Sequence, residues 1–169
     1  MEWNTGLASK KNKKMIEIER KYLVNSEAYL KGYFAKNDIC QGYICSDPER
    51  TVRVRIKGNK GFITIKGVGN EGQISRFEWE KEIEVDDAKA LLKLCEKGVI
   101  EKTRYEVQAG KHVVEVDVFY GENEGLIMAE IELENENDAI EKPNWLGLEV
   151  TDDVRYYNAY LAKNPFKSW

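Results

Sequence analysis

Glu17, Glu19 and Lys21 are the first residues whose types and spacing suggest chemistry. They alternate with Ile18 and Arg20, so in a β-strand the three side chains share one face, with successive members roughly 6.6 Å apart. Hard divalent cations such as Mg²⁺ and Mn²⁺ prefer carboxylate oxygens, and an ammonium beside them can contact an anion bound to the cation. This strand therefore has the side chains to hold a divalent cation together with an anionic ligand.

The same alternation carries basic side chains on later segments of the chain. Arg53 and Arg55 are separated by a valine, and Lys102 and Arg104 by a threonine. The planar guanidinium of arginine matches phosphate oxygens in pairs, which the ammonium of lysine does not. A triphosphate carries roughly four negative charges near neutral pH, a load that several such cations and a metal ion would balance. The basic candidates are Arg53, Arg55, Lys66, Arg76, Lys102 and Arg104.

Acidic side chains alternate in the same way on further segments. A sheet with one face in water also alternates between apolar and polar residues. A solvated face, however, usually mixes its charges with serine and threonine, whereas here Arg53-x-Arg55 and Glu130-x-Glu132 each place like charges where they repel. We therefore favour a functional charged face over a solvated one. The acidic candidates on these segments are Glu78, Glu80, Asp117, Glu130 and Glu132.

The elements that must position these side chains are mostly strands, and the predicted fold class is α+β, mainly β. Three helices are expected: a short one after Ser26, a second that Asp86 or Asp87 caps and Gly98 ends, and a last one over 152–163. Antiparallel strands with few helices indicate a closed barrel or a strongly curved sheet. With the charged face inward, the helices are available to cover the outward apolar face. The predicted strands are 15–24, 39–45, 51–57, 61–68, 74–85, 99–109, 111–119 and 127–135.

Composition limits the alternatives. The chain has 169 residues, of which 33% are charged, but a net charge of only −4, so no general attraction to nucleic acid or to an acidic membrane is implied. We expect one domain over 15–169 and a disordered extension over 1–14. No apolar run reaches the roughly 18 residues of a transmembrane helix. The three cysteines match no metal-binding spacing, which favours reduced thiols and a cytoplasmic location.

In chain order, these residues resemble the CYTH superfamily of triphosphate tunnel metalloenzymes. The family's hallmark Glu-x-Glu-x-Lys is met in full by Glu17, Glu19 and Lys21. The resemblance covers roughly residues 15–163. The other blocks are Gln41-Gly42-Tyr43, Arg53-x-Arg55, Thr64-x-Lys66, Arg76-x-Glu78-x-Glu80, Lys102-Thr103-Arg104-Tyr105, Asp117-Val118-Phe119, Glu130-Ile131-Glu132, and Val150-Thr151-Asp152 with Arg155-Tyr156 and Asn158.

The resemblance implies an eight-stranded antiparallel barrel that forms a tunnel, and metal-dependent hydrolysis or rearrangement of triphosphates with Mg²⁺ or Mn²⁺. The residues implied in catalysis are Glu19, Lys21 and Arg53. For Lys21 we favour positioning and charge stabilisation over general-base catalysis, because neighbouring carboxylates raise the pKa of an ammonium. The implied metal ligands are Glu17, Glu19, Glu130 and Glu132. Glu78, Glu80 and Asp117 would bind a second metal or orient the basic residues. The implied phosphate contacts are Lys21, Arg53, Arg55, Lys66, Arg76, Lys102, Arg104 and Arg155.

Within the family, several substrates are open. The chain shows no obvious insertion that could build a base-recognition pocket, which favours inorganic tripolyphosphate, with nucleoside triphosphates as weaker substrates. A class IV-type adenylate cyclase and a thiamine triphosphatase are the alternative enzymes. A non-catalytic polyphosphate-binding module is less favoured, because binding alone needs the cations more than the carboxylates. Tyr156, Tyr157 and Tyr160 in the last predicted helix serve either packing, which is the simpler interpretation, or a homodimer contact.

Overall fold

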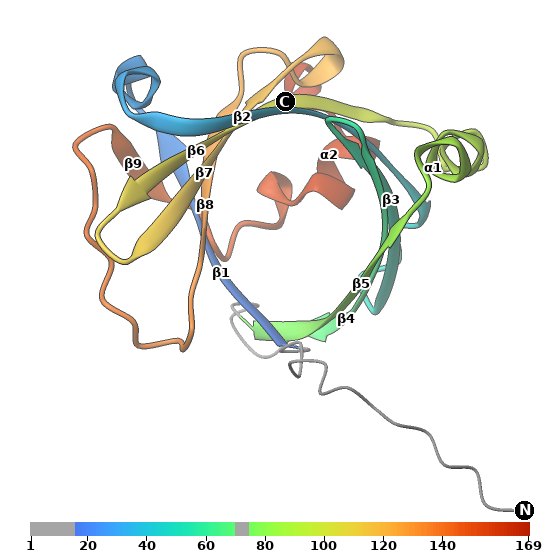
Figure 1. The fold of residues 1–169 in the computed structure, drawn as a ribbon, viewed down its shortest axis with the longest axis horizontal. Coiled ribbons are helices and arrows are strands. Elements are labelled where there is room, and N and C mark those ends of the chain that lie inside the picture. The colour runs from blue at the N-terminus through green and yellow to red at the C-terminus, as the bar shows by residue number, and fades with distance from the viewer. Residues whose placement is uncertain (1–15, 70–74) are drawn as a thin grey trace, which may run out of the picture.

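The charged strands pair into one antiparallel sheet that curves until its ends meet (Figure 1). The computed structural model describes residues 16–69 and 75–169, so the extension predicted at 1–14 lies outside the described residues. The strand order is β5-β4-β3-β2-β6-β7-β8-β1, and β1 also pairs with β5, which confirms a closed eight-stranded barrel. The barrel strands are β1 (Ile16–Val24), β2 (Tyr33–Cys45), β3 (Arg50–Lys57), β4 (Lys60–Gly69), β5 (Ser75–Ile83), β6 (Ile100–Ala109), β7 (His112–Phe119) and β8 (Ile127–Glu132).

Strand pairing places the charged side chains inside the barrel. In the register of β1 with β8, Glu19 lies opposite Glu132 and Lys21 opposite Glu130. Side chains alternate between the two faces of a strand, so the residues between these charges, such as the fully buried Ile131, lie on the outer side. The main hydrophobic core therefore lies between the barrel wall and the segments that cover it.

Two segments cover the outer face of β1, β6, β7 and β8. The short 3₁₀ turn η1 (Glu27–Lys31) contributes Tyr29, and the segment that leads into β9 (Leu146–Glu149) contributes Trp145. The two rings pack edge to face, with their centroids 6.0 Å apart. The strand β9, which the sequence analysis did not predict, pairs with β1. It has four residues, too few for a period-two pattern to stand out.

On the other side of the barrel, α1 (Val85–Leu92) packs against β2, β3 and β4. Gly42 of β2 allows the turn that follows α1 to approach the barrel, because a Cβ at that position would lie 2.9 Å from the Cβ of Cys95. The outer face of β4 and β5 is less well covered, since Ile65 and Trp79 are 38% and 36% exposed. The helices thus cover the outward apolar face only in part.

The first two predicted helices are shorter than expected. After Ser26 the chain forms only the turn η1, and β2 begins at Tyr33 rather than at residue 39. The helix α1 begins at Val85 after its N-cap Glu84, so neither Asp86 nor Asp87 caps it as predicted, and it ends at Leu92, before Gly98. From Tyr33 on, the barrel wall takes up residues whose spacing also suits a helix, because tertiary packing overrides local propensity. The residues that follow α1 form turns before β6 begins.

The last predicted helix, over 152–163, is interrupted. Tyr157 has an extended backbone (φ −78°, ψ 136°) between the turn η3 (Val154–Tyr156) and the short helix α2 (Asn158–Lys163). The carboxylate of Asp153 accepts a hydrogen bond from a backbone N–H of η3, which stabilises that turn on its own. After this break Tyr157 lines the lumen cavity, and of the turn η3 Val154 lines it as well, whereas Arg155 and Tyr156 do not.

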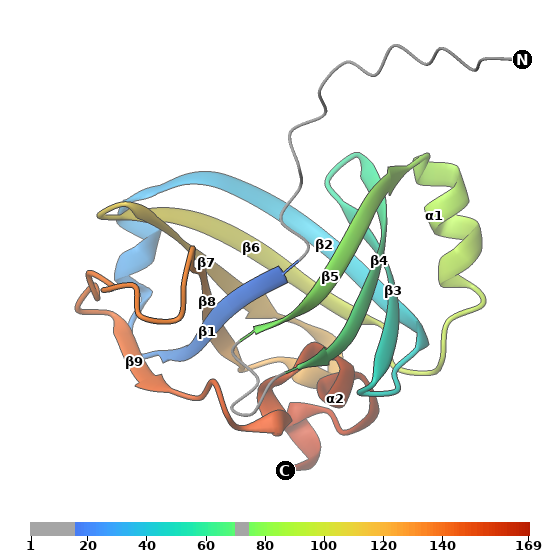
Figure 2. The same cartoon turned by 90° about the horizontal axis from the view of Figure 1, so that it is seen from below.

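The helix α2 lies across one end of the barrel (Figure 2). Its Leu161 is buried in an apolar cluster at that end. The short turns η2 (Gly121–Asn123) and η4 (Phe166–Ser168) contact each other beside it. In the part of the chain that the structure describes, no helix is long and apolar enough to cross a membrane. The other members of the cluster are Ile100, Phe119, Leu126 and Met128.

Candidate active site

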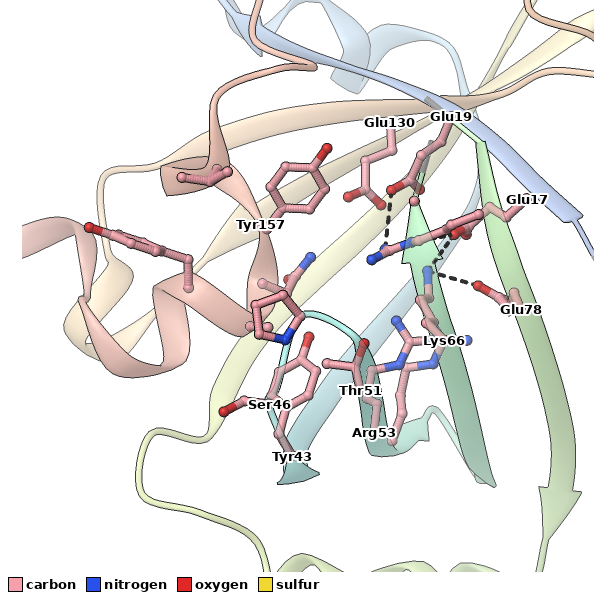
Figure 3. Close-up of a pocket in the computed structure, with 18 of the residues that line it drawn as sticks. Glu17, Glu19, Tyr43, Ser46, Thr51, Arg53, Lys66, Glu78, Glu130 and Tyr157 are labelled. Atoms are coloured by element: carbon pink, nitrogen blue, oxygen red, sulfur yellow. Dashed lines mark hydrogen bonds and ion pairs between the residues drawn. The ribbon is translucent and has the colours of Figure 1, made fainter. Parts of the chain in front are cut away.

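The lumen holds a cavity of about 710 Å³ that opens between the barrel wall and the C-terminal segment. Figure 3 shows Glu17, Glu19 and Glu130 on one side of it, with Lys66 and Arg53 on the other. Most of the site residues predicted from the sequence line this cavity. They are Glu17, Glu19, Arg53, Arg55, Lys66, Arg76, Glu78, Glu80, Lys102, Arg104, Glu130 and Glu132.

Carboxylates of β1 and β5 are held by basic side chains on the acidic side of the cavity. The Nζ of Lys66 lies 2.5 Å from Glu17 Oε2 and 2.7 Å from Glu78 Oε2. Arg76 Nε donates to the same oxygen of Glu17 at 3.4 Å, and Arg76 Nη2 lies 3.7 Å from Glu19 Oε1. A ligand that binds these carboxylates must therefore replace an ammonium or a guanidinium that already holds them.

Lys21 lies behind the acidic side and is only 2% exposed. Its Nζ donates to Glu19 Oε1 at 2.8 Å and to Glu130 Oε1 at 2.6 Å. Burial lowers the pKa of Lys21, but the two carboxylates outweigh burial and raise that pKa above its usual value. A protonated Lys21 can hold both carboxylates and stabilise negative charge, whereas it has no lone pair with which to take a proton from water.

The raised pKa of Glu132 indicates excess negative charge on the acidic side of the cavity. Partial burial, followed by the carboxylates of Glu17, Glu115 and Glu78, raises the pKa of Glu132. A divalent cation would relieve this repulsion, and carboxylate oxygens suit Mg²⁺ or Mn²⁺, so the residues fit such a metal in charge and donor type. Among the described residues, however, no three acidic, cysteine or histidine side chains converge on one point. Glu17 and Glu19 would have to turn from their basic partners toward the ion.

On the basic side, Arg53 and Arg55 of β3 share one carboxylate. Their Nη2 atoms lie 3.4 and 2.9 Å from Glu80 Oε2, and Arg53 Nη2 also donates to Thr64 Oγ1 at 3.1 Å. Burial, then repulsion from Arg53 and Arg104, lowers the pKa of Arg55 to about 10. The Nε atoms of both β3 arginines are buried and find no hydrogen-bond partner within residues 16–69 and 75–169. Phosphate oxygens would satisfy these donors.

A second basic group is built around Asp117, which is 1% exposed. Arg104 donates to both of its oxygens at 2.6 Å, and Lys102 Nζ donates to Asp117 Oδ2 at 2.5 Å and to Asn158 Oδ1 at 3.1 Å. Burial lowers the pKa of Lys102 to about 8, although Asp117 opposes that shift. Asp117 lies behind the cavity wall, so of its two predicted roles this geometry fits the orientation of the basic residues and not metal binding.

Arg155 is the predicted site residue that the structure places away from the cavity. Its side chain is 53% exposed, and its Nη2 lies 2.6 Å from Asp153 Oδ2. The guanidinium stacks on the rings of Tyr156 and Trp169. In this conformation Arg155 pairs with Asp153 and does not line the cavity, so its side chain is not placed to contact a phosphate there.

Sequence reasoning missed some residues of the cavity wall, chiefly Glu115 and Tyr157. Glu115 forms an ion pair with Arg104; its alternation with Asp117 places it on the charged face of this strand, but no site role was predicted for it. The sequence analysis expects Tyr157 to serve packing or a homodimer contact in a continuous helix, whereas the ammonium of Lys21 lies over its ring. Nothing in the local pattern distinguishes Tyr157 from the tyrosines beside it.

Comparison with known proteins agrees with this barrel and its two charged sides. The model of the CYTH domain matches residues 15–158. The chain belongs to the CYTH family. Membership of this family implies a requirement for a divalent metal ion, which fits the carboxylates of β1 and β8.

Similar proteins match this CYTH chain over nearly its whole length. An inorganic triphosphatase of Acetivibrio thermocellus is 49% identical over 157 residues, which cover 90% of this chain and 97% of the relative. An inorganic triphosphatase of Nitrosomonas europaea is 37% identical over 155 residues, with coverages of 88% and 97%. The crystal structure of the inorganic triphosphatase NE1496 has a TM-score of 0.63 at 34% identity, and the match covers 86% of this chain and 93% of that one.

Proposed function

We propose that this protein is a metal-dependent triphosphatase that hydrolyses inorganic tripolyphosphate to pyrophosphate and phosphate, with nucleoside triphosphates as weaker substrates. The observation that carries the proposal is a single cavity in which an acidic side faces a basic side. The acidic side suits a divalent cation and the basic side suits a chain of phosphates. The activity named for the two curated relatives supports the same reaction.

On the acidic side, Glu17, Glu19 and Glu132 would hold Mg²⁺ or Mn²⁺. When bound, the metal supplies positive charge that neutralises phosphate oxygens as the bond to the terminal phosphorus breaks. Lys21 holds Glu19 and Glu130 beside each other through its two short hydrogen bonds. Its role is therefore to position ligands and to stabilise charge.

On the basic side, Arg53, Arg55 and Lys66 would bind non-bridging oxygens and hold the phosphate chain extended. Cations that are already in place where charge develops lower the barrier without further reorganisation. Water attacks the terminal phosphorus, the bond from that phosphorus to the bridging oxygen breaks, and pyrophosphate leaves with the bridging oxygen. Arg104, which contacts both Asp117 and Glu130, links this side to the acidic one.

A phosphate-release assay tests the proposed reaction. Tripolyphosphate, ATP and thiamine triphosphate are each incubated with the protein and Mg²⁺ or Mn²⁺, and the products of ATP are also examined for cyclic AMP. We expect the fastest release from tripolyphosphate and no cyclic AMP. Release from none of the three would contradict the proposal and favour a polyphosphate-binding module, while cyclic AMP would indicate a cyclase.

Replacement of Glu19 tests the role of the acidic side. Glu19→Gln keeps the size of the side chain but removes the charge that would hold the metal, so we expect metal-dependent turnover to fall by about 100-fold or more. The matched control is Glu82→Gln, because Glu82 is 55% exposed at its side chain and pairs only with the surface residue Lys60 in the contacts described here. Near-normal activity of Glu19→Gln would rule out this assignment.

A further inference from the structure

The ring of Tyr157 faces two cations of the site at once. The Nζ of Lys21 lies 5.1 Å from the ring centroid, and the guanidinium carbon of Arg76 lies 5.8 Å from it. Both distances are within the roughly 6 Å over which the negative face of an aromatic ring attracts a cation. Figure 3 shows Tyr157 reaching from the C-terminal segment toward Glu19 and Glu130.

The two cations under this ring are neighbours of one carboxylate oxygen. Lys21 Nζ donates to Glu19 Oε1 at 2.8 Å, and Arg76 Nη2 lies 3.7 Å from the same atom. Two cations held this close repel each other, and the quadrupole of the ring offsets part of that repulsion. The position of Glu19 Oε1 therefore depends on where the ring holds its two partners.

Hydrogen bonds fix the ring relative to Lys21. The hydroxyl of Tyr157 donates to the carbonyl of Thr151 at 2.9 Å. Thr151 Oγ1 accepts from the backbone N–H of Lys21 at 3.1 Å, and Val150 N donates to the Lys21 carbonyl at 2.8 Å. Tyr157 and Lys21 are thus joined through the backbone as well as through the ring, and the joining residue Thr151 is 4% exposed.

We propose that Tyr157 is a positioning residue for Glu19 and that its ring strengthens metal binding at that carboxylate. The inference rests on the proposed function. Binding of a metal at Glu19 would draw the charge of this carboxylate from Lys21 and Arg76 to the ion, which would leave the buried ammonium and the partly exposed guanidinium with less negative charge beside them. The ring stays against both cations during this exchange and lowers its cost, so the affinity for the metal depends on the aromatic face of Tyr157.

The experiment compares Tyr157→Leu with Tyr157→Phe. Binding of Mn²⁺ is measured by calorimetry without substrate, and the Mn²⁺ concentration for half-maximal tripolyphosphate hydrolysis is measured separately. The leucine variant lacks the ring, and we expect its Mn²⁺ affinity to fall about tenfold. The phenylalanine variant keeps the ring, and we expect an affinity within about threefold of the wild type. The Mn²⁺ concentration for half-maximal hydrolysis should rise correspondingly, more in Tyr157→Leu than in Tyr157→Phe.

The matched control is Tyr156→Leu. Tyr156 precedes Tyr157 in the chain, but its ring stacks on Trp169, with the centroids 5.3 Å apart. We expect this variant to bind Mn²⁺ like the wild type, even where its melting temperature is lower. Equal losses of Mn²⁺ affinity in Tyr156→Leu and Tyr157→Leu would overturn the proposal, as would equal losses in the two Tyr157 variants.

A fluorinated series keeps the proposal testable if Tyr157→Leu does not fold. Phenylalanine, 4-fluorophenylalanine and 3,4,5-trifluorophenylalanine at position 157 have nearly the same shape, while fluorine weakens the negative face of the ring. We expect the Mn²⁺ affinity to fall stepwise along the series, and a flat series would overturn the inference. If the wild type binds Mn²⁺ but hydrolyses no triphosphate, the proposed function fails and the calorimetric comparison still decides the role of Tyr157. A wild type without Mn²⁺ affinity overturns both.

Discussion

Lys102 is the single residue that most directly sets a pH limit on the site. It is buried between Asp117 and Asn158, and burial lowers the pKa of Lys102 from 10.5 to about 8. Between these two values the folded chain binds fewer protons than the unfolded chain, so the contribution of Lys102 to stability increases as the pH rises. The positive charge that a phosphate would meet is lost over the same range.

We therefore predict that phosphate binding weakens above pH 8 while the fold does not. The KM for tripolyphosphate should rise by up to about tenfold for each pH unit above that value. In Lys102→Arg the charge persists, so the rise should move to higher pH. The profile of KM against pH is compared with that of Lys57→Arg, a lysine of the cavity wall that pairs with Glu106. An unchanged profile in Lys102→Arg would assign the limit to another group.

For single residues, the sequence predicts which side chains face the lumen where that direction follows from the alternation of a strand alone. Arg53, Arg55 and Glu19 line the cavity as expected, because alternation needs only the residues next to them. Arg155 and Tyr157 could not be placed in this way. Which of the two faces the lumen depends on a backbone break between η3 and α2, and that break is stabilised by contacts with β1 that are distant in sequence.

At the scale of elements, two glycines control how the two helices pack on the barrel. Gly98 has a positive φ of 101°, and a Cβ there would lie 1.6 Å from the carbonyl oxygen of Ala162 in α2. A Cβ at Gly42 would lie 2.9 Å from the Cβ of Cys95, on the outer side beside α1. An alanine at Gly98 would therefore disturb the end of the lumen, whereas an alanine at Gly42 would disturb the outer face of the barrel.

We predict that alanine at Gly98 lowers activity, whereas alanine at Gly42 does not. Gly98→Ala must displace α2, which carries Asn158 and follows Tyr157, so we expect kcat to fall about tenfold or more together with a loss of stability. Gly42→Ala should cost about 1–3 kcal/mol of stability through overpacking, with kcat close to that of the wild type. Urea denaturation and steady-state kinetics measure both effects. Equal changes of kcat in the two variants would show that α2 does not position the site.

The elements themselves were predictable where they are long. The eight barrel strands carry sustained alternation, and their existence followed from the pattern even where a boundary did not, as at Tyr33. The short strand β9 was not predictable, because its four residues are held by pairing with β1. The helical turn η1 was predicted in place after Ser26, but its short length was not. Tertiary contacts of this kind leave little local signal.

The molecule as a whole places its charges inside and its main hydrophobic core outside the barrel wall. The stability of the fold therefore comes largely from the outer core, while repulsion within the lumen opposes it. Glu132 reports this repulsion, since partial burial and neighbouring carboxylates raise its pKa. A raised pKa of an acid means that its contribution to stability is present at low pH and is lost as the pH rises through the folded value.

We predict that a divalent metal stabilises the whole barrel at neutral pH. Mn²⁺ or Mg²⁺ should raise the melting temperature, and the increase should grow with the logarithm of the metal concentration above its Kd, because the metal offsets the repulsion around Glu132. Glu132→Gln removes one of the repelling charges, so its melting temperature without metal should exceed that of the wild type, and the shift on adding metal should shrink. Calorimetric melting with and without metal measures both. A lower metal-free melting temperature in Glu132→Gln would contradict this account.

The ion pairs of the lumen have a consequence for how the two ligands enter. Lys66 forms ion pairs with Glu17 and Glu78. A metal that binds Glu17 therefore competes with Lys66 for this carboxylate. A phosphate that binds Lys66 competes with Glu17 for the ammonium in the same way. Each ligand thus leaves behind the group that the other needs. Metal and triphosphate should bind far better together than either does alone, as in an exchange of partners between two salts.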